Sequence, residues 1–102
     1  MSATYTVVYN LGWWEHEDCR NAYSVHDSEC KFVKTRNNYN SQGVWGSHDS
    51  VELAIEDSYF EARGRFAEAL AEFGFWHMIK VCKCAGGAAV KKQVKANGKV
   101  AA

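Results

Sequence analysis

Two cysteines at the end of an apolar segment are the first residues in this 102-residue chain that suggest chemistry. Cys82 and Cys84 close the segment FWHMIKVCKC (residues 75–84), with one lysine between them. Thiolates bind soft metals such as zinc, and cationic neighbours make a thiol more acidic and more reactive. The pair is therefore half of a metal site, a reactive thiol pair, or part of the packing of a strand.

The geometry of a regular strand argues against metal binding by this pair. Cys82 and Cys84 would share a strand face about 6.6 Å apart, whereas two thiolates on one zinc lie within about 4 Å of each other. The glycines after Cys84 allow a bend, and a zinc set would then be Cys19, Cys30, Cys82 and Cys84, with His16 as a substitute for Cys19. The C-x10-C and C-x-C spacings match no strong zinc signature. We expect packing cysteines, no metal ligands and no cofactor.

The remaining polar residues form no recognisable catalytic pattern. The four histidines are scattered, and none follows a spacing that pairs a base with an orienting partner. Glu15, Glu17 and Asp18 crowd one segment, but their spacing is not that of a calcium-binding loop. The glycines form no phosphate-binding or dinucleotide-binding fingerprint. The sequence therefore indicates a protein that is not an enzyme.

Charge is balanced overall but unevenly distributed along the chain. Residues 1–82 carry 7 basic and 12 acidic side chains, a net charge of −5, while residues 83–102 carry five lysines and no acid. The segment 85–102 contains no aromatic residue and opens on two glycines. We expect a compact domain over residues 1–84 and a flexible lysine-rich tail over residues 85–102. Lysines on such a tail commonly serve only to keep it solvated; in the alternative function the tail binds nucleic acid through Lys91, Lys92, Lys95 and Lys99.

Hydrophobic patterning predicts four strands and one long helix. Residues 4–11 alternate apolar and polar side chains, which is typical of a half-buried strand. Residues 22–26 and 30–36 are predicted to form a hairpin, residues 37–49 mostly a loop, and residues 75–84 the last strand.

The long helix is predicted over residues 50–73. Asp49 can cap its start, with Glu52 in the capping-box position, and Gly74 can end it. The predicted fold is α+β, a two-layer sandwich in which one long helix covers an antiparallel sheet of three to four strands. The element order is β-β-β-α-β. One helix covers only one sheet face, so the other face is left for solvent, self-association or a partner.

Aromatic residues are concentrated in the two longest predicted connections. They are Trp13, Trp14, Tyr39 and Trp45. Tryptophan and tyrosine are common interface anchors, so these rings, with the acidic residues Glu15, Glu17 and Asp18, are the candidate partner-binding surface. The alternative is that the rings fold back and cover the open sheet face.

In size and character the chain resembles small accessory proteins of bacteriophages and mobile elements: about 100 residues, aromatic-rich and free of motifs. That class includes inhibitors of host defence such as anti-CRISPR proteins. The resemblance implies a cytoplasmic protein that binds and blocks a larger protein or nucleoprotein complex. The alternative function is a nucleic-acid-associated module that uses the lysine tail, with or without zinc. A homodimer through the uncovered sheet face is a further option, and no membrane partner is expected.

Overall fold

The structure, a computed structural model, describes residues 4–10, 22–34 and 42–100. Its strands are β1 (Tyr5–Asn10), β2 (Tyr23–Asp27), β3 (Gln42–His48) and β4 (Ile79–Val81). Its helices are α1 (Lys31–Lys34), α2 (Val51–Arg65), α3 (Ala67–Phe73), α4 (Phe75–Met78), the 3-10 turn η2 (Lys83–Ala85) and α5 (Gly87–Asn97). None of these helices has the length and apolar character needed to cross a membrane.

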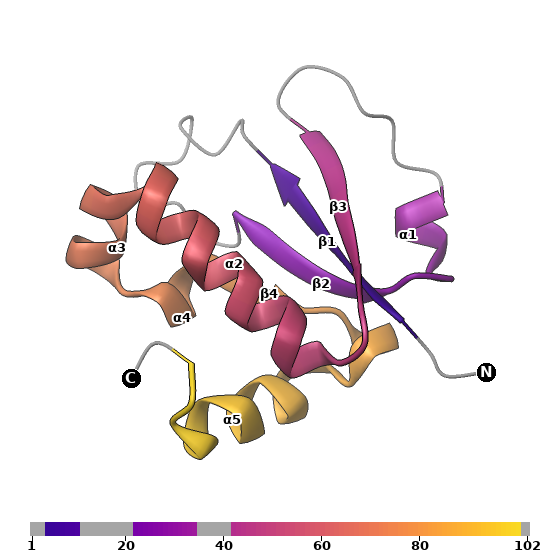
Figure 1. The fold of residues 1–102 in the computed structure, drawn as a ribbon. Helices are drawn as coiled ribbons and strands as arrows, with labels where there is room; N and C mark the ends of the chain where they lie inside the picture. The colour runs from indigo at the N-terminus through magenta and orange to yellow at the C-terminus, as the bar shows by residue number, and fades with distance from the viewer. Residues whose placement is uncertain (1–3, 11–21, 35–41, 101–102) are drawn as a thin grey trace.

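The four strands form one mixed sheet in the order β3-β1-β2-β4 (Figure 1). β1 pairs antiparallel with both β2 and β3, and β4 pairs parallel with β2, with Val25 opposite Val81. The α+β class and a sheet of four strands are confirmed, although the third strand lies at Gln42–His48 and not at residues 30–36. The expectation of a wholly antiparallel sheet was wrong, because the helical crossover α2–α4 brings the chain back to run alongside β2 in the same direction.

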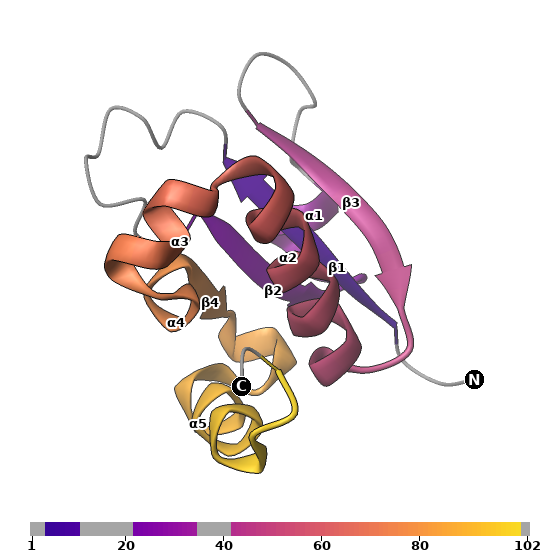
Figure 2. The ribbon, with the colours of Figure 1, turned by 60° about the vertical axis from the view of Figure 1, so that its left-hand side comes forward.

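Helix α2 covers one face of the sheet, and the core lies between them (Figure 2). The inward side chains of β2, Tyr23 and Val25, are almost completely buried, as are Ile55 of α2 and Met78 of α4. At the sheet edge, His48 Nε2 lies 3.0 Å from Asp57 Oδ2 of α2, and its Nδ1 lies 3.1 Å from the Tyr5 carbonyl oxygen. These contacts connect the end of β3 to both β1 and α2.

The single helix predicted over residues 50–73 is divided at Phe66, whose backbone (φ −127°, ψ 43°) is not helical. The break places the Phe66 ring in the core, where it meets Tyr23 edge-on with ring centroids 6.1 Å apart. Ser50, rather than Asp49, caps α2 by accepting a 3.1 Å hydrogen bond from the Leu53 N–H. Gly74 ends α3 with a positive φ, as predicted.

Three further predictions of local structure were wrong. Where a strand was expected over residues 30–36, residues Lys31–Lys34 form α1, because a turn at Asp27 leads directly into a helical hydrogen bond from the Val33 N–H to the Cys30 carbonyl. The loop expected over residues 37–49 contains β3, which pairs along β1. The strand expected over residues 75–84 begins as α4, since a helical turn buries Phe75 and Met78 on the same side.

The C-terminal segment also differs from the expected flexible tail. It forms η2 and α5, and α5 packs against β4 at the sheet edge (Figure 1). Val94 and Val100 are buried there and belong to the main core. An 11-residue helix is marginal on its own, so these contacts are what stabilise α5.

Gly86 enables the turn that leads into α5, and its replacement tests the geometry of that turn. Gly86 has φ +107°, and an added Cβ would overlap a methyl group of Val90. Gly98 has a similar positive φ of +70°, but its Cβ would point into open space. We expect Gly98→Ala to cost about 1 kcal/mol of unfolding free energy and Gly86→Ala about 2–4 kcal/mol. Urea unfolding monitored by circular dichroism measures both, and equal losses would contradict the close approach of Gly86 to Val90 at the start of α5.

A candidate metal centre

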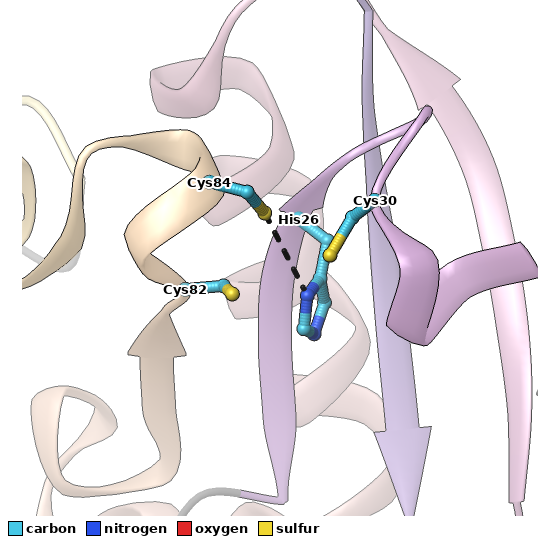
Figure 3. A group of neighbouring side chains, drawn as sticks. All are labelled: His26, Cys30, Cys82 and Cys84. Atoms are coloured by element: carbon cyan, nitrogen blue, oxygen red, sulfur yellow. Dashed lines mark hydrogen bonds between the residues drawn. The ribbon is translucent and has the colours of Figure 1, made fainter.

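Four side chains that can bind a metal converge on one point: His26, Cys30, Cys82 and Cys84 (Figure 3). One nitrogen of His26 and the three sulfur atoms all lie within 4.8 Å of one another. It is the one such group of three or more in the part of the chain that the structure describes. His26 is buried, Cys30 and Cys82 are half-buried, and Cys84 is exposed.

The chain turn after β4 brings Cys82 and Cys84 together. β4 ends at Val81, and the Ala85 and Gly87 N–H groups both donate to the Cys82 carbonyl, at 2.9 and 3.0 Å. The residues between them are therefore coiled into η2 rather than extended. The expectation that the two cysteines pack along a strand was wrong, and with it the 6.6 Å separation that argued against a metal.

Cys30 is positioned by a second turn, which follows β2. The Asp27 carboxylate accepts the Glu29 N–H at 2.9 Å, and the Cys30 N–H donates to the Asp27 carbonyl at 2.9 Å. Ser28 ties this turn to β1 through its backbone N–H, which donates to the Thr4 carbonyl at 3.0 Å. The Ser28 hydroxyl also lies 2.9 Å from the Thr4 hydroxyl and 2.8 Å from the Thr6 hydroxyl, and these contacts further hold the turn against β1.

His26 lies on the sheet face opposite α2, because it alternates along β2 with the core residues Tyr23 and Val25. Its Nδ1 points toward Cys84 Sγ, 3.9 Å away (Figure 3). Its Nε2 lies 2.9 Å from Ser24 Oγ, and that hydroxyl is oriented toward the Val8 carbonyl oxygen at 3.4 Å. If the Ser24 hydroxyl donates to Val8, Nε2 donates to Ser24 Oγ and Nδ1 presents its lone pair to the sulfur atoms, which is the tautomer that metal binding through Nδ1 requires.

The three thiols interact strongly with one another. Burial raises the pKa of Cys84 to about 12, reinforced by Cys82 and Cys30 and opposed by the Asp27 N–H, which lies 3.2 Å from Cys84 Sγ. Burial also acts to raise the pKa of Cys82. Hydrogen bonds from the Cys84 backbone and from the Cys84 and Cys30 thiols, with the charge of Lys80, hold that pKa below its usual value. Cys82 therefore ionises before Cys84.

The geometry suits a tetrahedral soft metal ion. Thiolates about 2.3 Å from a zinc in a tetrahedron lie about 3.8 Å apart, so donor atoms within 4.8 Å need only small movements to bind it. Three thiolates and one imidazole form a Cys3His set, which is a common structural zinc site. The N–H group of Asp27 and the Ser24 hydroxyl would act as the supporting hydrogen bonds that such ligands require.

The sequence predicted part of this group. Cys30, Cys82 and Cys84 of the alternative zinc set do meet, while the fourth member of the group is His26, which the spacing of the cysteines did not indicate. Cys19 lies outside the described residues, as do Trp13, Trp14, Glu15, Glu17, Asp18 and Tyr39. The backbone of Trp45 lies in β3 opposite Val7, and its side chain is not described. The spacing His26-x3-Cys30 was the available signal, since it resembles the short ligand spacings of zinc sites.

The lysines of the predicted tail are not members of the His26, Cys30, Cys82 and Cys84 group. Lys91, Lys92 and Lys95 lie on α5, and Lys99 follows it. They add a positively charged surface to the end of the molecule where η2 and α5 lie.

Comparisons with known proteins give no relative from which a function can be transferred. No protein-family model matches the chain, and the searches of curated proteins and of solved structures found no match either. The function is therefore argued from the site itself.

The difference in pKa between Cys82 and Cys84 predicts which of the two thiols is alkylated first in the reduced, metal-free protein. Cys84 is the more exposed of the two, so exposure alone favours its alkylation. The thiolate is the nucleophile, so we expect Cys82 to react with iodoacetamide about tenfold faster at pH 7.5. Tandem mass spectrometry of partly alkylated protein measures both sites. Faster modification of Cys84 would contradict the assignment of Cys82 as the thiolate.

Proposed function

We propose that this chain is a zinc-stabilised binding domain in which His26, Cys30, Cys82 and Cys84 hold one Zn²⁺. The convergence of four donor atoms from three separate segments supports this most directly. The hydrogen bonds of Ser24 to His26 and of Asp27 to Cys84 add support, because each orients a donor atom toward the common centre.

The role of the metal is structural rather than catalytic. Catalytic zinc keeps one coordination position open for water, whereas four protein ligands fill a tetrahedral ion. The ligands come from β2, the start of α1 and the turn after β4, so the metal cross-links segments that are more than 50 residues apart in sequence. Such a cross-link stabilises a domain of this size because a small core supplies little free energy.

We further propose that the domain is non-enzymatic and recognises a larger macromolecule, with the metal fixing the shape of the recognising surface. The inhibitory role and the aromatic surface of Trp13, Trp14, Tyr39 and Trp45 remain predictions from the sequence.

Zinc content tests the metal assignment. Full-length protein expressed with zinc and passed over a desalting column should contain one zinc per chain by plasma mass spectrometry. Free zinc at 100-fold over its dissociation constant adds about 2.7 kcal/mol of stability. Chelation should therefore lower the unfolding midpoint by about 10 °C or more.

Matched variants identify the ligands. Cys84→Ser and His26→Gln should lose zinc and the midpoint shift, whereas Cys19→Ser and His16→Gln should retain both. Loss of zinc in Cys19→Ser with retention in His26→Gln would replace His26 by Cys19 in the site. A protein that never takes up zinc, copper or iron after reduction would overturn the proposal.

Ser24 is expected to tune the metal affinity from the second coordination shell. Ser24→Ala removes the hydrogen-bond partner of His26 Nε2 without touching a ligand. We expect zinc affinity to fall about 10-fold or more, with one zinc still bound at saturation. Ser24→Thr keeps the hydroxyl and should restore most of the affinity. Competition with a chromogenic chelator measures all three proteins, and equal affinities would show that Ser24 does not orient His26.

A further inference from the structure

An open hollow lies directly beside the metal centre, between β4 and α5. Its volume is about 500 Å³, and its walls are mostly apolar. It is lined by Lys80, Val81, Cys82, Lys83, Gly87, Ala88 and Lys91. One wall is therefore the end of β4 with the turn that follows it, which carries Cys82, and the other is the first half of α5.

The charges around this hollow all have one sign. Lys80, Lys83 and Lys91 stand at its rim, and Lys95 lies one turn beyond Lys91 on the same face of α5. Among the residues that the structure describes, none of these four lysines forms an ion pair with a carboxylate. No acidic residue follows Glu72 in the chain.

This gathering of like charges destabilises the unbound protein. Like charges at positions i and i+4 of a helix repel each other, and α5 has no acidic residue in its first turn. Burial, followed by the charge of Lys95, lowers the pKa of Lys91. A surface that gathers unpaired ammonium groups around an apolar floor is complementary to an anion that also carries a flat apolar group.

We propose that this hollow binds a single-stranded nucleic acid, with a base on its apolar floor and the backbone phosphates on Lys80, Lys83, Lys91 and Lys95. Proteins that bind single strands combine a basic groove along the backbone with side chains, typically aromatic, on which unstacked bases rest. Here the aliphatic floor of Val81 and Ala88 would take the place of the aromatic rings. The row of lysines extends past the hollow, so it fits a repeating polyanion better than one small anion. A duplex presents phosphates but no unstacked base.

The inference deepens the proposed function by naming the partner class, and it rests on that function in one respect. The metal would fix Cys82 and the following turn, and thereby the position of Lys83 and the base of α5. The hollow itself is formed by the described residues, so the binding of the metal and of the strand can be measured separately.

The sharpest variant places a carboxylate in the hollow without disturbing the fold. Ala88 is exposed near the N-terminus of α5, where a glutamate interacts favourably with the helix dipole. Ala88→Glu should therefore fold and bind zinc as the wild type does, but repel phosphate. Ala88→Gln, of the same size and without charge, is its matched control.

Fluorescence anisotropy of the full-length, zinc-loaded protein with a labelled 12-nucleotide single strand measures binding. We expect dissociation constants of about 1–100 μM at 50 mM salt. Ala88→Glu should weaken binding about tenfold or more relative to Ala88→Gln. Lys91→Gln should reduce the slope of log affinity against log salt by about 0.7, whereas Arg65→Gln, the same charge change away from the hollow, should not.

The outcomes separate this inference from the zinc proposal. Equal binding by Ala88→Glu and Ala88→Gln, with zinc content and unfolding midpoint unchanged, would overturn the inference and leave the metal centre intact. Equally tight binding of a polyglutamate peptide would also overturn it, since the apolar floor would then contribute nothing and an acidic protein would be the partner. A protein that takes up no zinc but binds the strand with the predicted variant losses would instead remove the zinc proposal and support the hollow.

Discussion

The parallel pairing of β4 with β2 determines the position of every functional element described above. Val81 lies opposite Val25, and the Cys82 N–H continues the pairing with a 2.9 Å hydrogen bond to the Val25 carbonyl. This register places the C-x-C turn level with His26 and Asp27. A one-residue slip would turn the side chains of β4 to the other face and would separate the sulfur atoms from the imidazole.

The β2–β4 pairing is short, and the position of the C-terminal segment depends on it. β4 has three residues and forms an edge of the sheet, and an edge strand of this length contributes few hydrogen bonds. Helix α5 adds Val94 and Val100 to the core but concentrates positive charge that opposes close packing. A metal ion bound at the base of α5 would supply the missing stability at the weakest part of the sheet, which gives a physical reason for placing ligands there.

The sequence predicts the parts of the fold that depend on local patterns. Alternation along residues 4–11, the polar turn at Asp27 and the positive φ of Gly74 each follow from the chemistry of a few adjacent residues. The break at Phe66 and the helical turn at Phe75–Met78 depend on burial against Tyr23 and on core geometry, which no local pattern contains. Cys82 and Cys84 could not be interpreted correctly until the strand was known to end at Val81.

The candidate metal centre likewise depends partly on contacts between neighbouring residues and partly on contacts between residues far apart in the sequence. His26 and Cys30 are brought together by one turn, and Cys82 and Cys84 by another, so each half of the site is specified locally. The two halves meet only through the β2–β4 register. A metal that bridges them would therefore stabilise the one contact that local sequence cannot guarantee. It would also couple its own binding to the position of Lys83 and Lys91 around the neighbouring hollow, because Cys82 belongs to both sites.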